Sequence, residues 1–124
     1  MKTVSRADML SALCLMLASP AHAAGDAANG QALYEARCTG CHSVDENRVG
    51  PAHRGVFGRK AGTRDGFGYS NALKASAIVW NESTLNAWLT EPERLIPGQV
   101  MNVQVSDAKA RADIVAFLRS LKAR

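Results

Sequence analysis

Apolar side chains recur at helical spacing in several stretches of the chain. The clearest pattern starts at Ser106 or Asp107, and the first helix is expected from Asp26, which can cap it, to about Arg37. Shorter helices are predicted over 70–76 and 82–90, the second ending before Pro92. The last helix carries apolar residues at i, i+4, i+7, i+8 and i+11: Ala110, Ile114, Phe117, Leu118 and Leu121.

The stretch from Ser43 to Gly68 has no such period and is interrupted by Gly50-Pro51 and several further glycines. A loop of this length without secondary structure of its own needs something to wrap around. A second loop follows the third helical pattern and runs through Pro97-Gly98 to Met101. The pattern therefore predicts helices connected by one long loop that encloses a bound group.

Residues 1–23 have the pattern of a cleavable secretory signal. Lys2 and Arg6 precede an apolar run over 9–18, and Ala21-His22-Ala23 forms an A-x-A cleavage site. The apolar run is about half the ~20 residues needed to span a bilayer. We therefore expect export to the periplasm and no stable membrane insertion.

The remaining residues, 24–124, are enough for one globular domain. The chain has a formal net charge of +4, which falls by one when Lys2, Arg6 and Asp8 leave with the signal. This balance is too mild to indicate binding to nucleic acid or to a membrane surface.

The candidate chemistry lies in Cys38-Thr39-Gly40-Cys41-His42, which matches the C-x-x-C-H pattern of c-type haem attachment. Each cysteine sulfur adds to one haem vinyl group, and the adjacent imidazole then binds the iron. A thioredoxin-like dithiol is the first alternative, but it expects a strand before the motif and leaves His42 unexplained. A zinc site is the second, and it needs two further ligands, for which only Cys14, His22 and His53 remain.

The other axial position of such an iron can take a methionine, a histidine, water or a ligand. Three of the four methionines belong to residues 1–23, which leaves Met101, about sixty residues after the haem motif and following a Pro-Gly turn. His53 is the rival ligand. It lies too few residues from His42 to reach the opposite face of the haem easily. Met101 is therefore the favoured sixth ligand.

In these motifs the chain resembles the short class I cytochromes c, the mitochondrial-type and bacterial periplasmic group. The resemblance runs from Gly25 to Leu121. It rests on Gly30 with Tyr34, Cys38-Thr-Gly-Cys-His42, Gly50-Pro51, Gly55-Val-Phe-Gly-Arg-Lys-Ala-Gly62, Tyr69-Ser70, Trp80 and Pro97-Gly98-x-x-Met101.

This resemblance implies an all-α class I cytochrome c fold, in which the N- and C-terminal helices cross where Gly30 meets Phe117. It implies one haem c, bound covalently through Cys38 and Cys41. It also implies that Pro51 accepts a hydrogen bond from the axial imidazole of His42. The family positions that contact the inner propionate are occupied by Arg59, Tyr69 and Trp80.

The chain departs from the family pattern at several positions near the haem. His53 replaces an apolar residue, and Gln99 stands where a threonine commonly binds a propionate. Trp88 replaces a tyrosine that bonds the methionine sulfur, and Val103 an aromatic that shields the haem edge. Docking lysines are absent where Glu93 and Val100 stand, although Arg37 keeps one positive charge.

The expected function is one-electron transfer by a monomeric carrier that is not an enzyme, because His42 and Met101 fill both axial positions. Redox protein partners are expected to dock at the exposed haem edge near Cys38 and Cys41. A gas-binding sensor or weak peroxidase with a labile Met101 is an alternative. An electron-entry subunit of a larger periplasmic oxidoreductase is another.

Overall fold

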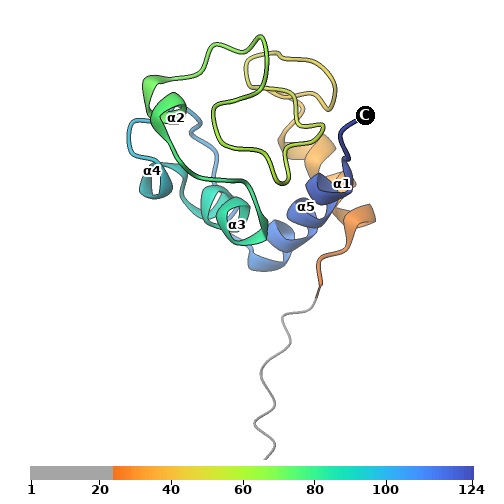
Figure 1. The fold of residues 1–124 in the computed structure, drawn as a ribbon. Coiled ribbons are helices and arrows are strands. Elements are labelled where there is room, and N and C mark those ends of the chain that lie inside the picture. Colours follow the sequence, from red (N-terminus) through yellow and green to blue (C-terminus); the bar gives the residue numbers. More distant parts are fainter. Residues whose placement is uncertain (1–23) are drawn as a thin grey trace, which may run out of the picture.

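The computed structural model describes residues 24–124, so the predicted signal over 1–23 lies outside the described residues. Helices α1 and α5 cross at one side of the molecule, and α3 and α4 lie next to one another on the other side (Figure 1). The fold is therefore all-α in its named elements, as the sequence predicts. The helices are α1 (Ala27–Arg37), α2 (Asn71–Ala75), α3 (Glu82–Thr90), α4 (Pro92–Leu95) and α5 (Ala108–Ser120).

The crossing of α1 and α5 depends on Gly30. A Cβ atom at this position would overlap the carbonyl of Asp113 and would lie 3.0 Å from Cβ of Phe117. The absent side chain therefore lets the two backbones approach, and the predicted contact between Gly30 and Phe117 is confirmed.

Side chains at the helix ends explain where α1 and α5 begin. The Asp26 carboxylate accepts hydrogen bonds from the backbone N–H groups of Ala28 and Asn29. Asp107 accepts one from the N–H of Ala110 in the same way. Both caps satisfy donors that have no partner within the first turn of a helix.

The sequence pattern missed α4. Helix α3 ends at Thr90, before Pro92, as the sequence predicts, and Pro92 then occupies the first turn of a new helix. Proline fits this position because its fixed φ suits a helix and its missing N–H has no intrahelical partner there.

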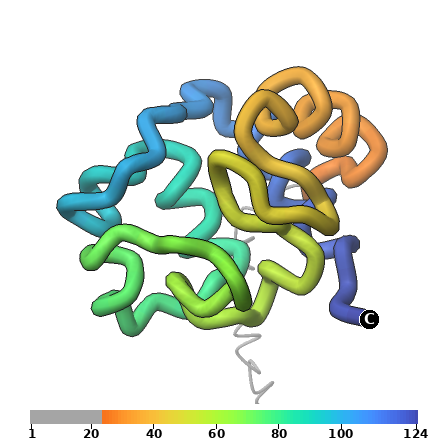
Figure 2. Tube along the Cα trace, turned by 90° about the horizontal axis from the view of Figure 1, so that it is seen from above, coloured from red at the N-terminus to blue at the C-terminus, as the bar shows by residue number. Residues whose placement is uncertain are grey.

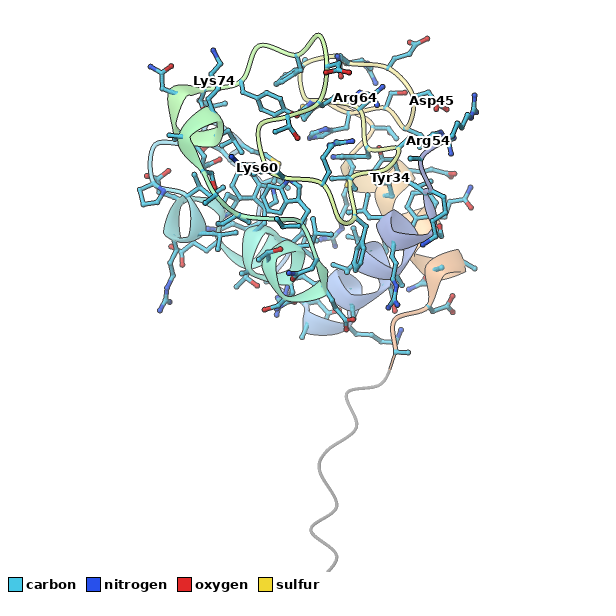
Figure 3. The ribbon with its side chains drawn as sticks, viewed as in Figure 1. Tyr34, Asp45, Arg54, Lys60, Arg64 and Lys74 are labelled. Carbon is cyan, nitrogen blue, oxygen red and sulfur yellow. The ribbon has the colours of Figure 1, made fainter. Side chains whose placement is uncertain are left out.

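The long loop between α1 and α2 passes between the α1–α5 pair and the other helices (Figure 2). It contains no helix, as predicted, and only an isolated antiparallel bridge pairs Lys60 with Val79. Arg54 braces the loop by donating two hydrogen bonds to the carboxylate of Asp45, and the two side chains lie together in Figure 3. This bidentate pair lowers the pKa of Asp45.

Candidate functional site

A cavity of about 340 Å³ lies between the long loop and the helices. Its size falls within the usual range for a cofactor site, and most of its lining is apolar or aromatic. The fold brings together at this cavity all eight residues that the sequence singled out, from segments far apart in the chain: Cys38, Cys41, His42, Pro51, Arg59, Tyr69, Trp80 and Met101.

The two thiols of the motif stand at the end of α1 and are not joined in a disulfide. Cys38 is half-buried, and burial raises the pKa of its thiol to about 11. A dithiol redox centre works through a thiolate of lowered pKa, so this environment does not suit one. Burial against apolar groups does suit a sulfur that ends in a thioether.

His42 is held in one orientation by its neighbours. Its Nδ1 lies 2.8 Å from the carbonyl oxygen of Pro51 and must donate to it, because a carbonyl only accepts. Burial lowers the pKa of His42, which favours the neutral ring. A Cβ atom on Gly50 would overlap this ring, so the glycine leaves the space that the imidazole occupies. Nε2 therefore keeps a lone pair for a metal ion.

His53 lies on the same side as His42. The two imidazole rings stack with their centroids 4.1 Å apart, and Nδ1 of His53 is 2.9 Å from the hydroxyl of Tyr34 on α1. Tyr34 is labelled in Figure 3. Burial lowers the pKa of His53 to about 3, so the ring is neutral at ordinary pH. The sequence placed His53 near the site but did not reveal its bond to Tyr34.

The polar end of the cavity contains Arg59 and Tyr69. The Arg59 guanidinium donates to the backbone carbonyls of Arg54 and Ala52, and burial lowers its pKa. The backbone N–H of Arg64 donates to the Tyr69 hydroxyl at 3.1 Å.

Trp80, the third residue expected beside a propionate, is buried and packs against Trp88 with ring centroids 5.3 Å apart. Both indole rings line the cavity. Trp88 therefore contributes apolar lining in the place where the family commonly has a tyrosine.

The donors that line the cavity test whether an anionic cofactor suits this end. The Arg59 guanidinium carries a positive charge, and Tyr69 can donate its hydroxyl hydrogen. A buried carboxylate needs such donors. The carboxylate groups of a haem would meet them here, so the residues present fit that group.

Met101 reaches the cavity from the segment between α4 and α5. Its backbone N–H donates to Oε1 of Gln99 at 2.5 Å, and Gln99 is itself buried. Gln99 does not line the large cavity but faces a smaller one, of about 210 Å³, which Met101 also borders.

Two features are absent from residues 24–124. His, Cys, Asp and Glu side chains form no group of three or more within that range that could hold a metal ion, so the zinc alternative finds no cluster there. No helix in the same range is long and apolar enough to cross a membrane.

Comparison with known proteins shows which family the chain belongs to. A family model described as cytochrome c matches residues 27–122, which is nearly all of the described chain. The chain belongs to the cytochrome c family.

Individual members of the family cover almost the same region. The chain is 44% identical over 101 residues to cytochrome c of Euglena viridis, covering 79% of this chain and 99% of the relative. It is 39% identical to cytochrome c2 of Rhodomicrobium vannielii over 108 residues, covering 84% and 86%. The solved structure of cytochrome cH from Methylobacterium extorquens matches with a TM-score of 0.74 at 41% identity, covering 77% of this chain and 99% of the other.

Membership in this family makes the chain a haem-binding electron carrier and not an enzyme, as the sequence analysis predicts. The all-α class I fold is likewise confirmed by the helical architecture and by the match to cytochrome cH. The roles of individual cavity residues follow as proposals.

Proposed function

We propose that this cytochrome c is a periplasmic one-electron carrier that binds one haem c through Cys38 and Cys41, with His42 and Met101 as axial ligands. The observation that carries the proposal is the convergence of both thiols, His42 and Met101 on one cavity. When bound, the haem supplies an iron that cycles between Fe(III) and Fe(II).

The protein's own groups fix the properties of that iron. Cys38 and Cys41 anchor the porphyrin by thioether bonds, and His42 binds through Nε2. The hydrogen bond from His42 Nδ1 to Pro51 orients the ring and makes it a stronger electron donor. Met101 supplies a soft thioether sulfur, which favours the reduced iron and raises the reduction potential relative to a second histidine.

Arg59, Tyr69 and Trp80 receive a propionate in this proposal. Arg59 and Tyr69 both line the cavity and can supply donors to a carboxylate. Positive charge and donors together lower the cost of burying a carboxylate.

Redox partners are proposed to dock where Cys41 is exposed at the cavity rim, with the protein acting as a monomer. The exposed side chains around this rim include Val49 and Val100, which are 77% and 76% exposed. Arg37 is the charged residue among the exposed cavity-lining groups. An apolar contact with little charge suits a short-lived complex that forms and separates quickly.

Export to the periplasm rests on the signal pattern of residues 1–23 and on the attachment chemistry, which in bacteria takes place outside the cytoplasmic membrane. Intact-mass spectrometry of the protein produced with haem-maturation machinery tests both points. The expected species begins at Ala24 and carries the mass of one haem. The Cys38→Ala/Cys41→Ala variant is expected to lose the covalent haem, and a chain that retains residues 1–23 would contradict the export proposal.

The sensor or peroxidase alternative shares the same attachment but leaves the sixth coordination position open. The second cavity is the feature that favours it, because Met101 borders this empty space as well as the large cavity. Binding of carbon monoxide to the reduced wild-type protein separates the two functions. The carrier is expected to bind it weakly and the sensor tightly.

A further inference from the structure

Gln99 is one of two buried polar side chains among the described residues. Both the oxygen and the nitrogen of its side-chain amide form hydrogen bonds. Oε1 accepts the hydrogen bond from the backbone N–H of Met101, and Nε2 lies 3.3 Å from Oε2 of Glu93. The orientation of the amide is fixed by chemistry. An N–H must face an oxygen, so the NH₂ group is left to face the carboxylate.

Glu93 also holds the turn that leads to Met101. Its other carboxylate oxygen accepts the backbone N–H of Gly98 at 2.9 Å. Gly98 has φ of +87°, a conformation that residues with a side chain rarely adopt. Glu93 and Gln99 therefore hold both Gly98 in the turn and the backbone of Met101.

Empty space also borders this segment. Met101 lines the polar cavity of about 210 Å³ as well as the large one. Atoms that border empty space make fewer van der Waals contacts, so the hydrogen bonds around Met101 contribute more to its position.

We propose that Glu93 and Gln99 form a clamp that positions Met101 for the iron, with Gln99 acting directly on the Met101 backbone and Glu93 acting through Gln99 and Gly98. The inference rests on the proposed axial role of Met101. It also gives Gln99 a different role from the family threonine: its amide is committed to the ligand loop and does not face the large cavity.

The test measures how easily imidazole displaces Met101 from the ferric, haem-loaded protein, followed by loss of the weak long-wavelength band of iron bound to methionine sulfur. Gln99→Leu keeps the side-chain volume and removes both hydrogen bonds. Its imidazole affinity is expected to rise about threefold to tenfold, as the loss of one hydrogen bond predicts. Glu93→Ala is expected to give a smaller rise in the same direction.

Two matched controls lie in the same region. Gln104→Ala changes a residue that borders the second cavity, and Glu91→Ala removes a neighbouring carboxylate whose side chain caps no helix. Both are expected to keep the wild-type imidazole affinity. In the double variant Gln99→Leu/Glu93→Ala, the rise is expected to fall short of the product of the two single effects, because the two residues act in one chain.

Wild-type imidazole affinity in both Gln99→Leu and Glu93→Ala would overturn the clamp while leaving the carrier proposal intact. If Gln99→Leu fails to take up haem, Glu93→Ala decides alone. Absence of the long-wavelength band from the wild-type protein would overturn the ligand assignment and the clamp together.

Discussion

The hydroxyl of Tyr34 and Nδ1 of His53 lie 2.9 Å apart inside the core. Tyr34 is only 2% exposed, and burial raises its pKa to about 12, so the phenol stays protonated. The pair couples α1 to the long loop directly behind His42. Because His53 stands where the family commonly has an apolar residue, the phenol and the imidazole depend on each other for a polar partner.

We predict that Tyr34→Phe destabilises the haem-loaded protein by about 1–3 kcal/mol, because it leaves a buried imidazole nitrogen unpaired. The double variant Tyr34→Phe/His53→Leu is expected to recover much of this loss, since both polar groups are then replaced by apolar ones. Urea unfolding of the wild type, both single variants and the double variant measures the coupling. Strictly additive losses would show that the two side chains are independent.

Asp113 joins the start of α1 to α5. Its carboxylate is 1% exposed and accepts hydrogen bonds from the backbone N–H of Asp26, from the side chain of Asn29 and from Lys109. These donors lower the pKa of Asp113 to about 2, with the bond from Lys109 as the largest cause.

A carboxyl of lowered pKa stabilises the fold fully above its ordinary pKa of 3.8 and loses that contribution as the pH falls toward about 2. We therefore predict that Asp113→Asn lowers the melting temperature at neutral pH, and that the difference from wild type narrows as the pH is lowered through this window. Thermal unfolding over a pH series measures it. Asp65→Asn, on the exposed part of the loop, is the control, and a pH-independent difference would contradict the prediction.

Gly30→Ala tests the helix crossing. Alanine favours a helix by about 1 kcal/mol over glycine, so an isolated helix would gain stability. Here the added methyl would overlap the backbone of Asp113, and we expect a net loss of roughly 1–3 kcal/mol. Gly40→Ala is the control, because a Cβ atom there meets nothing within 4 Å. Urea unfolding that shows Gly30→Ala to be neutral would contradict the close approach.

The parts of the fold that the sequence predicted are those with local causes. Asp26 and Asp107 each cap a helix that begins at the next residue. The spacing of Cys38, Cys41 and His42 by itself indicates haem attachment. These features need no knowledge of distant segments, because the interacting groups are close together in the chain.

The features that the sequence missed depend on distant or irregular contacts. Asp113 breaks the apolar face of α5, and its partner N–H on Asp26 is 87 positions away in the chain. Gln99 and Glu93 meet across a turn, where no periodic pattern operates. Such pairs become visible only when the backbone brings them together.

We predict that the rate of electron transfer to an acidic partner depends only weakly on ionic strength. The exposed cavity lining includes valines and Arg37, and Arg48 donates to the carbonyls of Thr39 and His42 beside it, so the charge available to steer a partner is modest. Stopped-flow measurements over a salt series test this. Arg37→Ala is expected to reduce the remaining salt dependence, and a steep fall of the wild-type rate with salt would contradict the account.

Axial ligation by His42 and Met101 is tested by comparing the optical spectrum of the oxidised, haem-loaded protein with that of Met101→Ala. We predict that the wild type shows the weak long-wavelength band of ferric iron bound to a methionine sulfur, and that the variant retains its covalent haem but loses this band. A wild-type protein with bound haem and no such band, or a band that persists in Met101→Ala, would contradict axial ligation by His42 and Met101.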